Sequence, residues 1–132
     1  MTRSWKLLGP AMTAAILCGC ASTHDIQREG HHPLGGGFND SQLRQGLFRI
    51  DAKSNLGIVA DISSARLAWK LRAEQLCGSS EFQEFAVHEY SVDSHLRYMG
   101  VTPKIAGRVG YALCASAGIS AADAIAFVRR PY

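Results

Sequence analysis

A stripe of apolar residues at helical spacing is the feature that most restricts what this chain can fold into. Its members recur every three or four positions: Ile58, Ile62, Ala65, Trp69, Ala73 and Leu76. Residues three and four apart share one side of an α-helix, so the spacing predicts an amphipathic helix at about 59–77. Gly78 follows directly and suits the left-handed conformation that ends many helices. A helix with one apolar side must cover another apolar surface.

Strand patterns lie on both sides of the predicted helix. Apolar and charged side chains alternate within 46–53, which predicts a half-buried strand. Aromatic and β-branched residues are frequent in 82–92 and in 108–116, and these segments predict two further strands. We expect a long connection at 93–107 to join them in a hairpin.

A short helix is predicted near the C-terminal end. The run Ser120-Ala121-Ala122-Asp123 resembles a capping box, apolar residues follow it at helical spacing, and Pro131 would end the helix. The predicted order is therefore β-α-β-β-α. This is an α+β domain in which a small antiparallel sheet is packed by one long helix and a C-terminal helix. Phe48, Trp69 and Tyr111 are expected to fill its core.

The N-terminal residues have the composition of a targeting segment. Arg3 and Lys6 precede an uncharged, mostly apolar stretch at 7–17. This stretch is too short to span a membrane, which takes about 20 apolar residues, and it fits a secretory signal peptide. The run that closes it, Leu17-Cys18-Gly19-Cys20, resembles the lipobox of bacterial lipoproteins.

The lipobox resemblance implies a division of the chain. Residues 1–19 would be a lipoprotein signal peptide, and Cys20 would become an N-terminus that carries palmitate. Residues 20–37 are polar and rich in glycine, so we expect a lipidated N-terminus and a flexible tether before a domain at 38–132. Ordinary secretion, with cleavage after Ala21, is the alternative. No Asp follows Cys20, which favours the outer membrane, with the domain facing the periplasm.

The charge balance gives little reason to expect a nucleic-acid partner. The chain has 14 Lys and Arg against 11 Asp and Glu, a net charge of +3. Arg3 and Lys6 belong to the predicted signal peptide, so its removal leaves a nearly neutral chain. Such a chain has no strong attraction for a phosphate backbone, and we expect no nucleic-acid partner.

The cysteines predict a covalent link within the domain. With Cys18 removed and Cys20 acylated, Cys77 and Cys114 remain as a pair in an oxidising compartment. A bridge between them would close a loop of about 40 residues and stabilise the fold by about 3–4 kcal/mol. Two free buried thiols, or a catalytic cysteine, are the alternatives.

Several short motifs resemble a group of small proteobacterial envelope lipoproteins. They are Gly36-Gly37-Phe38, Phe48-Arg49-Ile50, Asn55 and Leu71-Arg72-Ala73-Glu74. The resemblance covers about a third of the chain. It implies a small α/β domain in the cell envelope and no particular reaction.

Residues capable of catalysis do not form a recognisable pattern. Asp93, Ser94 and His95 are consecutive, which does not make a catalytic relay, and no Gly-x-Ser-x-Gly elbow is present. The adjacent His31 and His32 lie in the predicted tether, where two neighbouring side chains rarely converge on a metal. We therefore predict no catalytic residues, no metal site and no cofactor.

These features together predict a non-enzymatic lipoprotein, attached to the membrane through the lipid on Cys20. Its domain would be a structural or interaction module with an envelope protein as partner. An envelope-stress sensor or assembly accessory is one alternative. A small periplasmic hydrolase is another.

Overall fold

The computed structural model describes residues 24–31 and 34–130. The lipobox run and Cys20 lie outside the described residues, so their predicted roles stay predictions. The elements in chain order are α1 (Ile26–Glu29), β1 (Gly37–Arg44), β2 (Leu47–Lys53), α2 (Ile62–Cys77), β3 (Phe82–Asp93), β4 (Lys104–Cys114) and α3 (Ala121–Val128).

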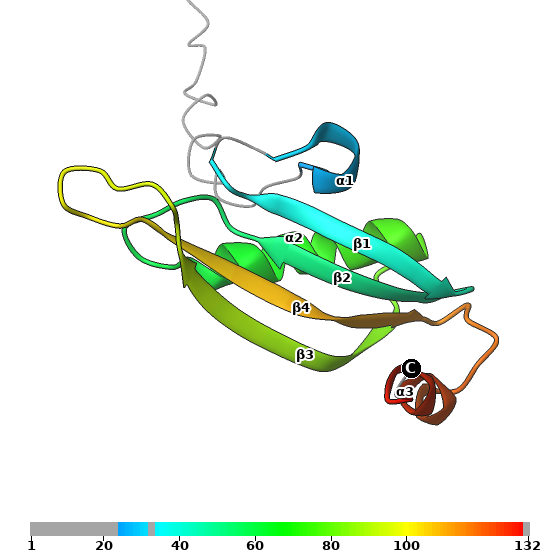
Figure 1. The fold of residues 1–132 in the computed structure, drawn as a ribbon. Coiled ribbons are helices and arrows are strands. Elements are labelled where there is room, and N and C mark those ends of the chain that lie inside the picture. The colour runs from blue at the N-terminus through cyan, green and yellow to red at the C-terminus, as the bar shows by residue number, and fades with distance from the viewer. Residues whose placement is uncertain (1–23, 32–33, 131–132) are drawn as a thin grey trace, which may run out of the picture.

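The four strands form one antiparallel sheet in the order β1-β2-β4-β3 (Figure 1). Two hairpins, β1–β2 and β3–β4, lie side by side, and β2 and β4 join them at the centre of the sheet. The predicted α+β class and antiparallel sheet are confirmed. The predicted element order is wrong in detail, because a strand and a short helix precede the predicted first strand.

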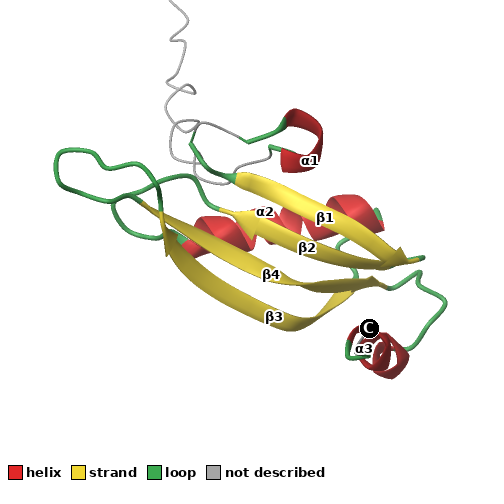
Figure 2. Cartoon of the chain, in the orientation of Figure 1, coloured by secondary structure: helices red, strands yellow, loops and turns green. Residues whose placement is uncertain are grey.

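Helix α2 crosses one face of this sheet, and α3 lies at one end of the molecule (Figure 2). Trp69 on α2 is fully buried, and its Nε1 donates a hydrogen bond of 3.1 Å to the Ile50 carbonyl. Strand side chains alternate between faces, so Leu47 and Leu113 point away from α2 and pack against Ala124 of α3. The sheet therefore has a core on each face.

The three aromatic residues predicted to fill the core are divided between the two faces of the sheet. Phe48 and Trp69 belong to the core under α2. Tyr111 is half-buried on the opposite face, where its ring stacks on Phe85 with centroids 5.4 Å apart. A single-residue step along β4 reverses the face, which the strand prediction at 108–116 did not resolve.

Helix α2 starts later than the spacing predicts. Asp61 caps its first turn, accepting hydrogen bonds from the Ser64 N–H at 3.0 Å and the Ser64 hydroxyl at 2.5 Å. Ile58 is therefore outside the helix and 79% exposed. The predicted end is confirmed, because Gly78 has φ 68° and ψ 9°, the left-handed conformation.

Part of the segment predicted to be a tether forms a short helix, α1. Asp25 caps the short helix α1, and the His24 carbonyl accepts a hydrogen bond of 2.9 Å from the Phe38 N–H. Strand β1, which begins at Gly37, was not predicted because Asn39 and Asp40 are poor strand formers. Pairing with β2 along an edge supplies the backbone hydrogen bonds that its side chains do not favour.

Strand β4 is longer than predicted at its start. Residues 104–107 pair with the end of β3, with Asp93 opposite Lys104, so the connection shrinks to 94–103. A bulge at Phe85–His88 shifts the register of β3, and Ala86 within it has φ 49°. This bulge decides which β3 side chains face α2.

Candidate functional site

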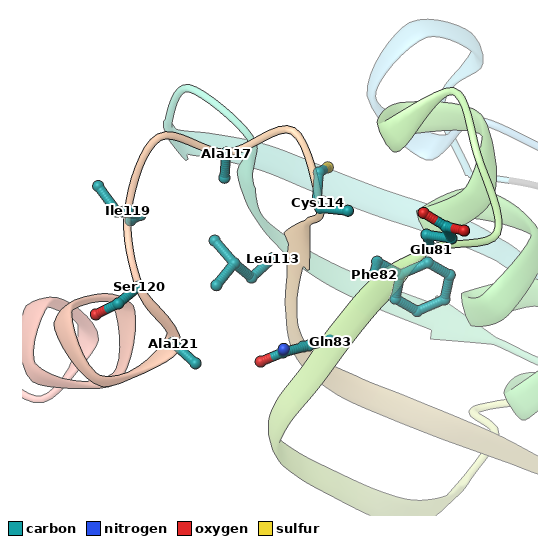
Figure 3. A pocket seen from close by; sticks show the side chains of 10 residues that line it. Glu81, Phe82, Gln83, Leu113, Cys114, Ala117, Ile119, Ser120 and Ala121 are labelled. Carbon is teal, nitrogen blue, oxygen red and sulfur yellow. The ribbon is translucent and has the colours of Figure 1, made fainter.

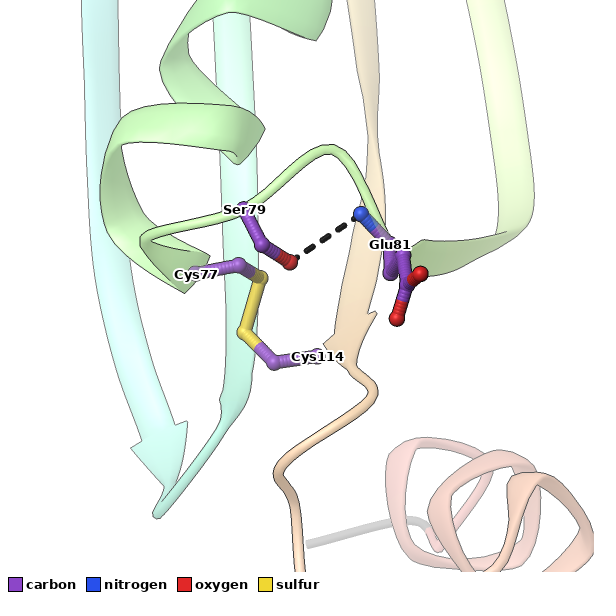
Figure 4. The surroundings of a disulfide bond; sticks show 4 residues. All are labelled: Cys77, Ser79, Glu81 and Cys114. Atoms are coloured by element: carbon purple, nitrogen blue, oxygen red, sulfur yellow. Dashed lines mark hydrogen bonds between the residues drawn. A yellow bond between two sulfur atoms is a disulfide. The ribbon is translucent and has the colours of Figure 1, made fainter.

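The predicted disulfide between Cys77 and Cys114 is present (Figure 4). Cys77 is the last residue of α2 and Cys114 is the last of β4, with Cα atoms 5.3 Å apart. The Ser79 hydroxyl accepts a hydrogen bond of 3.1 Å from the Glu81 N–H, which turns the chain from α2 into β3. The bridge therefore ties the end of the long helix to a central strand.

A cavity of about 410 Å³ opens beside this bridge, and we call it the disulfide-side cleft (Figure 3). It lies between the ends of β3 and β4 and the segment that leads into α3. Its lining residues are Glu81, Phe82, Gln83, Leu113, Cys114, Ala115, Ala117, Ile119, Ser120 and Ala121. The Ala115 N–H donates a hydrogen bond of 3.1 Å to the Glu81 carbonyl, which joins two of these lining residues.

The chemistry of the disulfide-side cleft is mainly apolar. Gln83 and Ala121 point toward one another across its opening, and the Ser120 hydroxyl points away (Figure 3). That hydroxyl caps α3, accepting a hydrogen bond of 3.1 Å from the Asp123 N–H. The cleft is apolar with a polar rim, so an apolar side chain fits it better than a charged group does.

A network of charged side chains lies on the α2 side of the sheet. Arg108 of β4 donates hydrogen bonds to Glu89 at 2.7 Å and to Glu84 at 2.8 Å. Its guanidinium also lies 5.3 Å from the centre of the Trp69 ring, a cation–π contact. Arg66 on α2 reaches Glu89 with two hydrogen bonds, at 2.6 and 2.8 Å.

Two arginines acting on one carboxylate change its acidity. The hydrogen bonds from Arg66, and then the one from Arg108, lower the pKa of Glu89 to about 2. Each hydrogen bond favours the charged form of the carboxylate. The network therefore links α2 to both β3 and β4, and its role in the structure is to hold these elements together.

Asp93, Ser94 and His95, the residues considered for a hydrolase, lie together in the structure, and Asp93 and Ser94 make other contacts. Asp93, Ser94, His95 and His31 line a cavity of about 350 Å³ at the base of the β3–β4 hairpin. The Asp93 carboxylate pairs with Lys104 at 2.6 Å, and the Ser94 hydroxyl bonds to the Leu96 carbonyl at 3.2 Å. Both contacts shape the hairpin.

The other histidines also have local contacts. His24 contacts the C-terminal end of α1. Its Nδ1 lies 2.7 Å from a carboxylate oxygen of Glu29, and its Nε2 lies 2.7 Å from the Gly30 carbonyl oxygen. His88 is exposed on β3 beside Tyr90, with ring centroids 6.5 Å apart. His32 lies outside the described residues. Within the part of the chain that the structure describes, no three metal-binding side chains are grouped.

Comparison with known proteins adds no relative. No family model, no curated protein and no solved structure matches the chain. Among residues 24–31 and 34–130, no helix has the length and apolar character needed to cross a membrane.

Sequence reasoning found the disulfide but missed the cleft and the charged network. The cleft depends on where the segment after Cys114 places Ile119 and Ala121, and no local pattern reports that position. The pairing of Arg108 with Glu89 depends on the β3 bulge, since a strand without it would turn Glu89 to the other face.

Proposed function

We propose that this chain is a lipid-anchored protein of the bacterial outer membrane whose domain faces the periplasm and binds another envelope protein. The observation that carries the proposal is the run Leu17-Cys18-Gly19-Cys20 directly after a short apolar segment. The bond between Cys77 and Cys114 supports it, because disulfides persist in oxidising compartments such as the periplasm.

The disulfide-side cleft is the proposed contact for that partner. It is concave and mostly apolar, and the rigid ends of two strands and a helix form its walls. An exposed apolar side chain of an envelope protein would lose water-exposed area there, which is the main driving force for such contacts.

Metabolic labelling with radioactive palmitate tests the anchor. The wild-type chain should take up label in the cell envelope, and Cys20→Ala should abolish it. Cys18→Ala is the matched control and should keep the label, because a small residue two positions before the acylated cysteine satisfies the lipobox. Label that survives Cys20→Ala would overturn the proposed anchor.

Site-specific photocrosslinking in intact envelopes tests the partner site. A photoreactive residue in place of Gln83, at the rim of the cleft, should give one dominant adduct. Placing it at Leu71, exposed on α2, should not give that adduct. Filling the cleft with Ala121→Trp should remove the adduct formed from position 83. An adduct insensitive to Ala121→Trp would show that the partner binds elsewhere.

An envelope-stress sensor is a second candidate, favoured by the position of Cys114. This residue belongs both to the disulfide and to the wall of the cleft, so reduction would loosen the binding surface itself. Deletion of the gene and the double variant Cys77→Ala/Cys114→Ala should then both alter an envelope-stress reporter. An unchanged reporter in both strains would remove this candidate.

A further inference from the structure

Large apolar side chains are exposed mainly at one end of the molecule, which we call the hairpin end. It consists of the β3–β4 connection at 94–103 and the neighbouring β2–α2 loop at 54–61. Its most exposed apolar side chains are Met99 at 86%, Ile58 at 79%, Val59 at 76% and Tyr98 at 72%. Exposed apolar surface gathered in one place marks a contact site.

The two loops of the hairpin end are fixed side by side. Gly57 and Lys104 exchange two backbone hydrogen bonds, of 3.0 and 2.7 Å, which join the β2–α2 loop to the base of the hairpin. Both loops extend from the same end of the sheet in Figure 1. Among the described residues, the large exposed apolar side chains outside this end are Leu34, Leu67 and Leu71 on α2, and Val92 on β3.

The tip of the hairpin holds an apolar side chain in an unfavourable backbone conformation. Tyr98 and Val101 exchange two backbone hydrogen bonds of 2.9 Å, and the two residues between them have φ 48° at Met99 and φ 82° at Gly100. Positive φ at both positions is the type I′ turn, which favours Asn or Gly at the first. Methionine there is strained, yet it projects its side chain into solvent at the apex.

The remaining side chains of the hairpin end suit a lipid headgroup region. Residues 94–103 include one arginine, Arg97, and no Asp or Glu. The loop at 54–61 carries one charged residue, Asp61, at the end where it caps α2. Tyrosine favours the membrane interface, and arginine can keep its charge among headgroups while its stem lies on apolar surface.

The chain enters the domain at this same end of the sheet. The His24 carbonyl bonds to Phe38 at the start of β1, which pairs with the last residues of β2. Cys20 lies four positions before His24, so the chain between them can span at most about 14 Å. A lipid on Cys20 would therefore hold this end of the sheet close to the bilayer.

We propose that the hairpin end inserts its apolar side chains into the surface of the membrane that holds Cys20. This inference rests on the lipid anchor of the proposed function. The domain then has two membrane contacts, the acyl chains and the hairpin, and stands with its sheet directed away from the bilayer. The hairpin contact fixes the orientation that a lipid on a short segment alone would leave free.

Vesicle flotation tests this contact without the lipid anchor. The protein is residues 20–132 with Cys20→Ala, which retains every contact described above. The probe is a vesicle of phosphatidylethanolamine and phosphatidylglycerol. We expect co-flotation, and at least a tenfold weaker partition for Tyr98→Ser/Met99→Ser. Leu67→Ser/Leu71→Ser is the matched control on α2 and should partition like the parent protein.

A second measurement reads the depth of insertion directly. In a Tyr98→Trp variant, the tryptophan emission should shift to shorter wavelength with vesicles and be quenched by brominated phospholipid. Trp69, which is fully buried, gives a constant background. Urea unfolding of each variant verifies that the fold is intact.

The possible outcomes separate the hypotheses. Absence of flotation by the Cys20→Ala protein, or flotation unaffected by Tyr98→Ser/Met99→Ser, overturns the membrane contact. Self-association that this double variant abolishes, without vesicle binding, overturns it too and assigns the surface to a second copy. Palmitate labelling of Cys20 without vesicle binding leaves the anchor standing, and vesicle binding without labelling removes only the anchor.

Discussion

Gly107 and Tyr90 show how the absence of one side chain organises the face of the sheet opposite α2. The two residues are direct partners across β4 and β3, and the Tyr90 ring occupies the space that a β-carbon on Gly107 would need. The ring thereby crosses β4, and the Tyr90 hydroxyl donates a hydrogen bond of 2.8 Å to Asp51 on β2. Burial, and then this hydrogen bond, raise the pKa of Tyr90 well above its usual value.

Gly107→Ala should therefore destabilise the domain. The new methyl group would displace the Tyr90 ring and break its hydrogen bond to Asp51, at a cost of about 2 kcal/mol. Urea unfolding measures the difference. Gly118→Ala is the control, because a β-carbon there meets no atom within 4 Å, and it should change stability by less than about 0.5 kcal/mol. Equal effects of the two substitutions would contradict this account.

Glu89 should make the stability of the domain depend on acid. Its pKa is about 2 in the folded protein against 4.5 for the unperturbed group, so the folded state favours the charged form. Its contribution is complete above pH 4.5 and is lost as the pH falls toward 2. Glu89→Gln should lower the urea midpoint at neutral pH and flatten its decline between these values. Glu74→Gln is the control, because it leaves Glu89 in place. A urea midpoint that declines with acid as little in Glu74→Gln as in Glu89→Gln would contradict the assignment of the effect to Glu89.

Helix α2 depends on its first turn as well as on its apolar stripe. Asp61 accepts two hydrogen bonds from Ser64, and both lower the pKa of its carboxyl group. Asp61→Ala should cost about 1 kcal/mol in unfolding free energy at neutral pH. Asp61→Asn keeps one side-chain oxygen, which can still accept the capping bond from the Ser64 N–H, and should restore most of the loss. A loss of unfolding free energy as large in Asp61→Asn as in Asp61→Ala would show that charge, not capping, matters at this position.

The link between α2 and β4 should contribute more than any single cap. Its cysteines are 37 residues apart, so reduction releases a long loop in the unfolded chain and should cost about 4 kcal/mol. Urea unfolding of oxidised and reduced protein compares the two states directly. Reduction should leave the unfolding of Cys77→Ala/Cys114→Ala unchanged. A reductant effect in that variant would point to another target.

At the scale of the whole molecule, the two cores share β2 and β4 and should unfold together. Leu47 is fully buried against α3 on the face opposite Trp69. Leu47→Ala should cost about 3 kcal/mol, because it leaves a cavity there. The same loss should appear in Trp69 fluorescence and in far-UV circular dichroism, since coincident transitions mark a single cooperative unit. A Trp69 transition left unchanged by Leu47→Ala would show that the two faces unfold separately.

The architecture also separates two proposed contacts. The hairpin end and the disulfide-side cleft lie at opposite ends of β4, whose eleven residues span about 33 Å. A domain seated on a membrane by its hairpin would hold the cleft at that height in the periplasm. A partner bound in the cleft would therefore not compete with the bilayer.

Prediction from the sequence worked where the signal is local and periodic. The stripe around Trp69, the helix end at Gly78 and the cap at Ser120 all follow from side chains within one or two turns. Strand β1 was not predicted because its residues do not favour extended structure. Helix α1 was not predicted because it lies in a polar segment. Both elements are held by contacts with other segments, β1 by pairing with β2 and α1 by the bridge from Asp25 to Phe38. No local pattern in the sequence reports such contacts.

The sequence by itself determined the α+β class, the long helix and the pairing of Cys77 with Cys114, and it alone carries the proposal of a lipid on Cys20. Only the tertiary structure decided the strand order, the second core under α3 and the gathering of exposed apolar side chains at the hairpin end. The physical reason is the distance along the chain over which each signal acts. Helical periodicity and cysteine chemistry act through neighbours or single pairs, whereas register, bulges and surface patches depend on which distant segments meet.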